Sequence, residues 1–237
     1  MTAEQYLQRA FLLASQANPK AIRPNPFVGA VVVSENGEIV GEGFHQKAGE
    51  AHAEVMAIHQ ALDHGAILET CTLYVTLEPC SHTGKTPPCT DLIIQHRIPR
   101  VVIGSMDPNP LVSGVRILEE HGVKVDVFII PEIVTLNDTF NINQTLKRPK
   151  YVLKSAITLN GKIADHSGNS QWISNEESRN HVHQFLRTAA DAILTTAKTI
   201  IRDDVTMNIR IKDRMEQELN LIVFDRNLDL LKKENHQ

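Results

Sequence analysis

The chain has 237 residues, 24 Lys+Arg against 28 Asp+Glu, and a formal net charge of −4. Its hydrophobic fraction of 42% suits a globular protein of one large or two small domains and is too high for a disordered chain. The acidic balance argues against non-specific nucleic-acid binding, and no run reaches the ~18–20 apolar residues of a membrane span. Residues 1–5 show no signal-peptide pattern, so we expect a cytoplasmic enzyme without nucleic-acid or membrane partners. Three cysteines favour a metal or catalytic role over disulfides.

The first part of the chain alternates helices and strands. Residues 4–17 place apolar side chains on one helical face, and residues 28–33 and 38–44 predict a β-hairpin around Asn36-Gly37. Later patterns predict helices over 53–63, 90–96 and 115–121, and strands over 72–77, 100–105 and 123–129. A hairpin followed by alternating elements predicts a layered α/β domain whose later strands are mostly parallel.

A basic, proline-marked segment at residues 147–150 predicts a linker between two domains, 1–146 and 147–237. The second domain is predicted to open with a strand over Tyr151–Ile157. A helix is predicted from about Asn175 to Leu186, with Asn175 as its N-cap. Two further strands are predicted over 192–195 and 221–224.

The residues that point to chemistry lie in three short motifs, His52-Ala53-Glu54, Pro79-Cys80 and Pro88-Cys89. One imidazole and two thiolates make three zinc ligands and leave a fourth position for water, as in catalytic zinc sites. Zinc lowers the pKa of bound water, and a carboxylate that is not a ligand can then carry protons. Glu54 is predicted to be that carboxylate. The order H-x-E…P-C…C is typical of zinc deaminases.

Each motif alone has an ordinary explanation. A lone His-x-Glu is common without any function, and an isolated cysteine is more often a small buried hydrophobe. Cys71 precedes a predicted strand and has no partner motif, so it is predicted to be such a core residue. The three motifs in order, with a strand leading into Pro79-Cys80, favour zinc.

These motifs resemble those of a bifunctional riboflavin-biosynthesis family, and the resemblance covers residues 5–225. It also includes Pro24-Asn25-Pro26, Gly43-Phe44-His45, the stretch 78–89 and the stretch 107–110. The family joins a diaminohydroxyphosphoribosylaminopyrimidine deaminase to a 5-amino-6-(5-phosphoribosylamino)uracil reductase. The resemblance implies a cytidine-deaminase-like three-layer αβα domain followed by a partial dihydrofolate-reductase-like α/β domain. It also implies zinc-dependent deamination of a small phosphoribosylaminopyrimidine.

For the deaminase part, the resemblance implies substrate contacts by Asn25, His45, His82, Lys85, Asp107 and Asn109. Eight residues, 81–88, separate the two cysteines, whereas nucleoside and tRNA deaminases usually have two. The inserted loop carries cationic and hydrogen-bonding groups that suit a phosphorylated substrate. Ordinary alternatives stay open: Asn25 and Asn109 as turn residues between prolines, and Lys85 as a solvated charge. Residues 113–116 look a residue or two shorter than the family's segment, so the shape of this loop is expected to differ.

For the reductase part, the resemblance implies NADP contacts by Ala156, Trp172, Thr199 and Asp203, and substrate contacts by Ser170, Arg187, Met207 and Arg210. The alternatives are a core role for Trp172 and a surface charge for Arg187. Val205 stands where the family has proline, and Gly168 is the last of 12 glycines, although dinucleotide phosphates are normally held by glycine-rich turns. We therefore expect an incomplete NADP(H) site and a lost or incomplete reductase activity.

Three functions stay open at this point. The first is the family's deaminase, and the second is a tRNA or nucleoside deaminase, which the long spacing between the cysteines and the acidic balance disfavour. The third is a non-catalytic zinc-binding assembly module, which gives no role to Glu54. A homo-oligomer also stays open.

Overall fold

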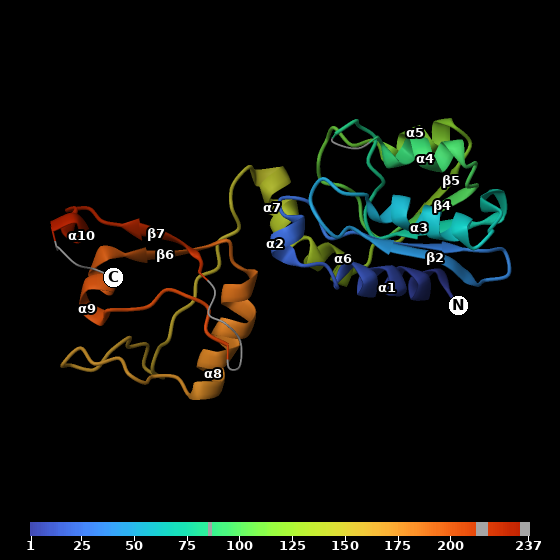
Figure 1. Ribbon diagram of the computed structural model, residues 1–237. Coiled ribbons are helices and arrows are strands. Elements are labelled where there is room, and N and C mark those ends of the chain that lie inside the picture. Colours follow the sequence, from blue (N-terminus) through green and yellow to red (C-terminus); the bar gives the residue numbers. More distant parts are fainter. Residues whose placement is uncertain (85–86, 212–217, 233–237) are drawn as a thin grey trace. The chain divides into compact units, whose positions relative to one another are not determined.

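The computed structural model describes residues 1–84, 87–211 and 218–232, and the chain forms two compact units, Met1–Tyr151 and Val152–Gln237 (Figure 1). We call them unit 1 and unit 2 and describe each by itself. No helix among the described residues is long and apolar enough to cross a membrane.

Unit 1 is built on a five-stranded sheet with the order β2-β1-β3-β4-β5. The strands are β1 (Gly29–Val33), β2 (Ile39–Phe44), β3 (Thr72–Val75), β4 (Arg100–Ile103) and β5 (Lys124–Val127). β1 is antiparallel to both β2 and β3, whereas β3, β4 and β5 run parallel to one another. The structure thus confirms both the predicted hairpin and the parallel later strands.

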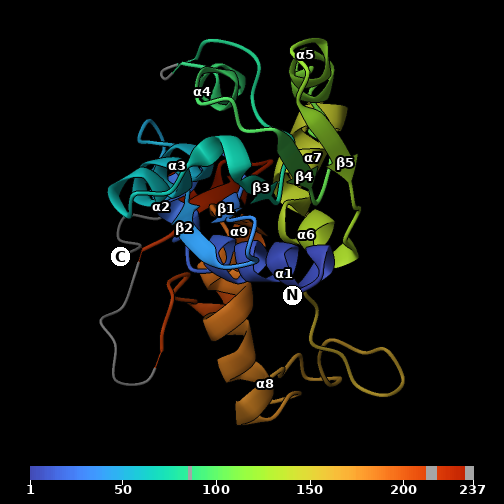
Figure 2. The same cartoon turned by 90° about the vertical axis from the view of Figure 1, so that its right-hand side faces the viewer.

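Helices cover both faces of this sheet, which makes the three layers seen in Figures 1 and 2. One face carries α3 (Ala53–Asp63), α4 (Cys89–Gln95) and α5 (Gly114–Glu120), and the other carries α1 (Ala3–Ala14) and α6 (Pro131–Leu136). The short α2 (Pro19–Ile22), a 3-10 turn (Leu68–Thr70) and α7 (Asp138–Leu146) complete the unit.

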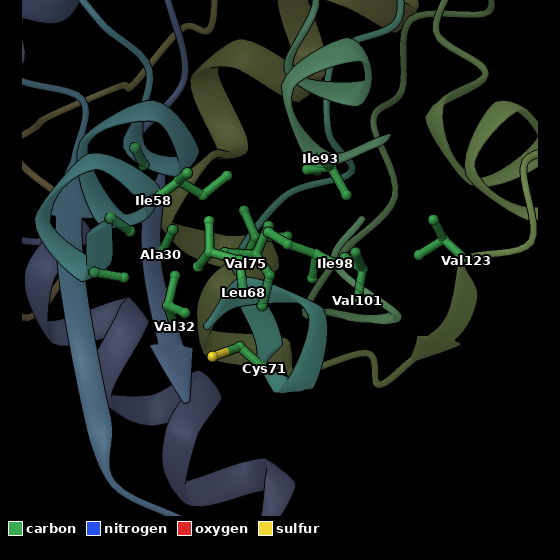
Figure 3. Close-up of a cluster of buried hydrophobic side chains, with 14 of the residues drawn as sticks. Ala30, Val32, Ile58, Leu68, Cys71, Val75, Ile93, Ile98, Val101 and Val123 are labelled. Atoms are coloured by element: carbon green, nitrogen blue, oxygen red, sulfur yellow. The ribbon is translucent and has the colours of Figure 1, made fainter. Parts of the chain in front are cut away.

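The strands are buried on both faces, and their side chains alternate between two apolar clusters. Ala30 and Val32 of β1 join the cluster beneath α3 and α4, whereas Val31 and Val33 join the cluster against α1 and α6. Figure 3 shows the first cluster, in which the predicted core residue Cys71 is 1% exposed. Continuous apolar runs such as residues 28–33 therefore reflect burial from two sides.

The sequence analysis missed α6 and α7. Pro131 begins α6, a position where the absence of a backbone N–H costs nothing, and α7 buries no residue, so neither has a strong apolar period. Their junction matters because the buried Asn137 bonds both backbone groups of Phe27. Its Oδ1 accepts from Phe27 N at 2.8 Å and its Nδ2 donates to Phe27 O at 2.9 Å. This pair fixes the segment that carries Asn25.

Unit 2 contains a parallel two-stranded sheet, β6 (Ala192–Thr196) and β7 (Asn220–Phe224). Its helices are α8 (Glu176–His181), α9 (Ala197–Asp203) and α10 (Asp229–Lys232), and a π-helical turn (Val182–Arg187) continues α8. Asn175 caps α8 as predicted, since its side chain accepts from Ser178 N.

The predicted strand over Tyr151–Ile157 is wrong. This segment forms no strand and pairs with none in the part of the chain that the structure describes, and Leu153 is 96% exposed. A β-branched apolar run becomes a strand only where a neighbouring strand accepts its ladder of hydrogen bonds, and sequence pattern does not supply that neighbour.

Truncation of Leu7 tests the packing of α1 on the sheet. Leu7 is fully buried, so Leu7→Ala should lower the free energy of unfolding by about 2–5 kcal/mol in a urea titration followed by circular dichroism. Leu12 lies on the same helix and is 51% exposed, so Leu12→Ala is the matched control and should change that free energy by about 0.5 kcal/mol or less. Equal effects of the two substitutions would contradict the described packing.

Candidate metal centre

Three potential metal ligands from distant parts of the sequence meet in unit 1. His52 directly precedes α3, Cys80 lies in the loop that follows β3, and Cys89 is the first residue of α4. Their ligand atoms all lie within 4.8 Å of one another. His52 Nδ1 is 3.2 Å from Cys89 Sγ and 3.5 Å from Cys80 Sγ. The carboxyl end of β3 and the starts of two helices thus bring together the three predicted ligands.

The two cysteines differ in protonation state, since Cys80 favours the thiolate and Cys89 the thiol. The pKa of Cys80 is lowered to about 4, because its thiolate accepts hydrogen bonds from the Cys89 thiol, from His52 and from the Cys89 backbone N–H. The same neighbour raises the pKa of the Cys89 thiol. The hydrogen bond to Cys80 also raises the pKa of His52. Two sulfurs and an imidazole nitrogen crowded in this way fit a zinc ion, which replaces protons at such ligands and keeps a fourth position open.

Glu54 lies beside these ligands without being one of them. It occupies the first turn of α3, is 3% exposed, and has a pKa raised to about 7, chiefly because of its burial and secondly because of the charge on Cys80. Gly43 of β2 allows this close packing, since a Cβ at that position would lie 2.6 Å from the Ala53 carbonyl oxygen. A buried carboxyl group next to a metal position is suited to carry protons.

Asn25 and His45 form a hydrogen-bonded pair next to the ligands. His45 Nδ1 lies 3.1 Å from the Ala51 carbonyl oxygen, which can only accept, so Nδ1 carries the proton. The other ring nitrogen, Nε2, therefore accepts from the Asn25 side-chain amide at 3.0 Å. Burial lowers the pKa of His45, which keeps the ring neutral. Its ring meets the His52 ring edge-on at 5.5 Å, so both predicted contact residues lie at the metal centre.

Asp107 and Asn109 lie in the loop that follows β4. Asp107 Oδ1 accepts from Asn109 N at 2.8 Å, and Asn109 Oδ1 accepts from Leu111 N at 3.2 Å. Asn109 therefore has the turn-forming bond that its neighbouring prolines suggested. Burial raises the pKa of Asp107, and the charges of Glu78 and Cys80 act in the same direction, which places this carboxyl near the ligand loop.

The loop between the two cysteines is only partly described. His82 is exposed on it, and its charge acts on Asp107. Lys85 lies outside the described residues, so its predicted contact stays a prediction.

Glu78 is a site residue that the sequence analysis used only as part of a motif. Its side chain is 5% exposed, and both its oxygens accept from backbone N–H groups, Oε1 from Val115 at 3.0 Å and Oε2 from Asp107 at 3.3 Å. The sequence did contain a signal for this role, namely an acidic residue directly after the apolar run 72–77. A charge at the end of a buried strand needs hydrogen-bond partners.

In unit 2, five of the eight predicted reductase residues fall into two groups. Arg187 donates to the Asn208 carbonyl oxygen, and Arg210 donates to Thr206 O at 3.0 Å and to Asn208 Oδ1 at 2.5 Å. The half-buried Met207 lies in the same segment. Two guanidinium groups are thereby gathered on residues 206–210.

The second group lies around α9. Thr199 pairs with Thr196 through their hydroxyls at 3.1 Å, and the exposed Asp203 ends the helix. Arg202 donates to Gly168 O at 3.1 Å and so joins the loop before Ser170 to α9.

Trp172 is 69% exposed and stacks on Arg179, whose guanidinium carbon is 4.2 Å from the ring centroid, so the core alternative for Trp172 is wrong. Arg187 is half-buried rather than a free surface charge. Among the described residues, Ala156 shares no hydrogen bond or ring contact with the other predicted reductase residues.

Each of the two parts of the chain matches a model of a known protein family. Residues 1–105 match the family model for the cytidine and deoxycytidylate deaminase zinc-binding region, and residues 149–235 match the RibD C-terminal domain. The riboflavin biosynthesis protein RibD of Aquifex aeolicus is 46% identical over 223 residues, which are 93% of this chain and 61% of that protein. The chain belongs to the RibD family.

Solved structures agree with this family assignment and with the predicted fold class. The Thermotoga maritima diaminohydroxyphosphoribosylaminopyrimidine deaminase/5-amino-6-(5-phosphoribosylamino)uracil reductase superposes with a TM-score of 0.83 at 43% identity, covering 95% of this chain and 63% of that one. An Aspergillus oryzae Rib2 deaminase in complex with DARIPP has a TM-score of 0.50 at 25% identity, covering 61% of this chain and 98% of that one. The chain spans about 60% of the length of the RibD relative from Aquifex.

Metal analysis tests the three ligands. The intact chain should bind one zinc ion, and Cys80→Ala or Cys89→Ala should lose it on dialysis against a chelator, because two remaining ligands hold zinc poorly. Cys71→Ala is the matched control: Cys71 is buried in the core away from the cluster, so its zinc content should stay that of the parent. Zinc retained by the Cys89 variant would contradict the site.

The pH dependence of unit 2 should follow His183. Burial and the charges of Arg187, Arg210 and Lys154 lower its pKa to about 4, and its Nδ1 accepts from Arg210 N at 3.0 Å. An unfolded histidine titrates at about 6.5, so between these values the unfolded state binds more protons. The free energy of unfolding should therefore fall as the pH drops from about 6.5 toward 4.

Urea titrations at several pH values would measure this effect through the fluorescence of Trp172, the single tryptophan of the chain and a residue of unit 2. His183→Gln keeps an acceptor but does not titrate, so its curve should be flatter. His166→Gln, at an exposed position of the same unit, should behave like the parent. An unchanged slope in His183→Gln would show that another group titrates.

Proposed function

We propose that unit 1 is a zinc-dependent deaminase that converts 2,5-diamino-6-(5-phosphoribosylamino)pyrimidin-4-one to 5-amino-6-(5-phosphoribosylamino)uracil. The observation that carries the proposal is the buried Glu54 beside a three-ligand cluster of one histidine and two cysteines. Membership of the RibD family, and the deaminase activity in the name of the Thermotoga relative, support the choice of substrate.

The reaction is a hydrolysis, in which a C–O bond forms and a C–N bond breaks without any redox change. Bound zinc would supply a water of lowered pKa, so that hydroxide is present near neutral pH. Glu54 would accept the proton of the attacking water on its carboxylate and deliver it to the departing amino group, which leaves as ammonia. Its pKa near 7 lies in the range where a carboxyl group can both accept and donate a proton.

The remaining polar residues would hold the substrate. The neutral His45 fixes the Asn25 amide by accepting from its Nδ2, so the amide keeps one orientation toward a bound ring. Asp107 is half-buried near the ligand loop and Asn109 follows it. His82 supplies a group for the phosphoribosyl part, and Lys85 is proposed for the same part from the sequence alone.

A nucleoside or tRNA deaminase is the alternative from the same fold, and the eight residues between the cysteines disfavour it. Unit 2 belongs to the RibD C-terminal domain by its match over residues 149–235. The expectation of an incomplete NADP(H) site there stays a prediction, and the deaminase proposal does not depend on it.

Glu54→Gln should reduce ammonia release by about 10²–10⁴-fold, because the amide cannot carry the proton. The variant should keep its zinc, since Glu54 is not one of the three ligands. Ammonia would be measured by a coupled assay on the zinc-loaded chain, with Glu69→Gln as an exposed control that should match the parent.

Full activity of Glu54→Gln would contradict the role of the carboxyl group. Release of ammonia from cytidine or from a tRNA anticodon loop, but not from the phosphoribosylaminopyrimidine, would favour the alternative deaminase. No release from any of these by the zinc-loaded parent would favour a non-catalytic zinc module.

A further inference from the structure

The loop that carries Cys80 is joined to the loop that carries Asp107 through one buried carboxylate. Glu78 lies two residues before Cys80, and its two oxygens accept from the backbone N–H groups of Asp107 and Val115. Glu78 is 5% exposed, and a carboxylate at that depth is tolerated only with such partners. Asp107 lies in the loop between β4 and α5, and Val115 lies in the first turn of α5.

Three further contacts hold the same two segments together. The Glu78 backbone N–H donates to Ser105 O at 2.9 Å, and the Ser113 backbone N–H donates to Ser81 Oγ at 2.9 Å. Gly114 lies so close to the ligand loop that a Cβ there would be 2.1 Å from Pro79 O. The segment 113–116, whose shape was expected to depart from the family's, therefore starts α5 directly against the cysteine loop.

We propose that Glu78 is a positioning residue for the deaminase reaction, which acts through the backbone of Asp107 and Val115 to hold residues 107–109 beside the metal ligands. The inference rests on the proposed function and deepens it. With its N–H held by Glu78 and its Oδ1 held by Asn109 N, Asp107 is restrained at two points, so its carboxyl group keeps one direction toward the site.

This role differs from that of a residue needed only for folding or for metal binding. The other two ligands lie at the starts of α3 and α4, helices that Glu78 does not contact through its side-chain hydrogen bonds. One partner of the carboxylate, Asp107, lies instead in the loop proposed to touch the substrate, and the other, Val115, lies in the first turn of α5, which follows that loop. Loss of the carboxylate should therefore weaken substrate binding while zinc content and the chemical step persist.

Glu78→Gln tests the proposal because it keeps the shape but replaces one acceptor oxygen by an NH₂ group. We expect KM to rise about tenfold, the effect of one lost hydrogen bond to a charged acceptor, with kcat within about threefold of the parent. Zinc content should stay at one ion per chain. Hydrogen exchange at the Asp107 and Val115 amides should accelerate, a readout that requires no activity. Glu119→Gln, an exposed position on α5, is the matched control and should leave all four quantities unchanged.

Ser81→Ala is the second variant, and it decides the matter if Glu78→Gln does not fold. It removes the acceptor of Ser113 N and should raise KM while zinc and kcat are kept. If the parent releases ammonia and both variants keep the parent's KM, the proposal is overturned. It is equally overturned if Glu78→Gln loses zinc, or if kcat falls as far as KM rises. A parent that releases no ammonia refutes the proposed function instead, and unchanged amide exchange in Glu78→Gln refutes the positioning role.

Discussion

The site depends on one constraint, the meeting of two sulfurs and an imidazole nitrogen within 4.8 Å at the end of β3. Such crowding is unfavourable unless charge is shared, and the hydrogen bond from the Cys89 thiol to the Cys80 thiolate shares it. The sheet supplies the rigidity that keeps these groups together. β3 lies between β1 and β4, with apolar clusters on both faces, so the residues that follow it have a fixed starting point.

The helices contribute to the same constraint through close packing rather than through long side chains. Gly43 brings β2 against the first turn of α3, and Gly114 brings α5 against the Pro79 carbonyl group. Each glycine stands where a methyl group would force a backbone apart. The metal ligands, Glu54 and the Asp107 loop are therefore positioned by backbone approach, which a substitution far from the chemistry can disturb.

The sequence was most informative where local pattern and burial agree. Apolar runs flanking Asn36-Gly37 were enough to predict the hairpin, and the spacing of His52, Cys80 and Cys89 was enough to predict the ligand set, because both depend on residue type alone. α6 and α7 were missed since neither has a continuous apolar stripe, and Tyr151–Ile157 was wrongly predicted as a strand since pairing is a property of a neighbour. The proton position on His45 also required the structure, because it follows from the carbonyl group of Ala51.

The two units differ in how much apolar surface they bury, and this difference bears on where activity can be located. In the described part of unit 2 the buried hydrophobic residues are Ala197 and Ile209, whereas unit 1 has clusters on both faces of its sheet. Burial of apolar surface is the main favourable term in folding, so the described residues of unit 2 gain little stability from their own core. A site that requires fixed geometry belongs on the better-packed unit. All three metal ligands, Glu54 and the bonds of Glu78 lie within unit 1, so the packing of unit 1 holds the geometry of the metal centre.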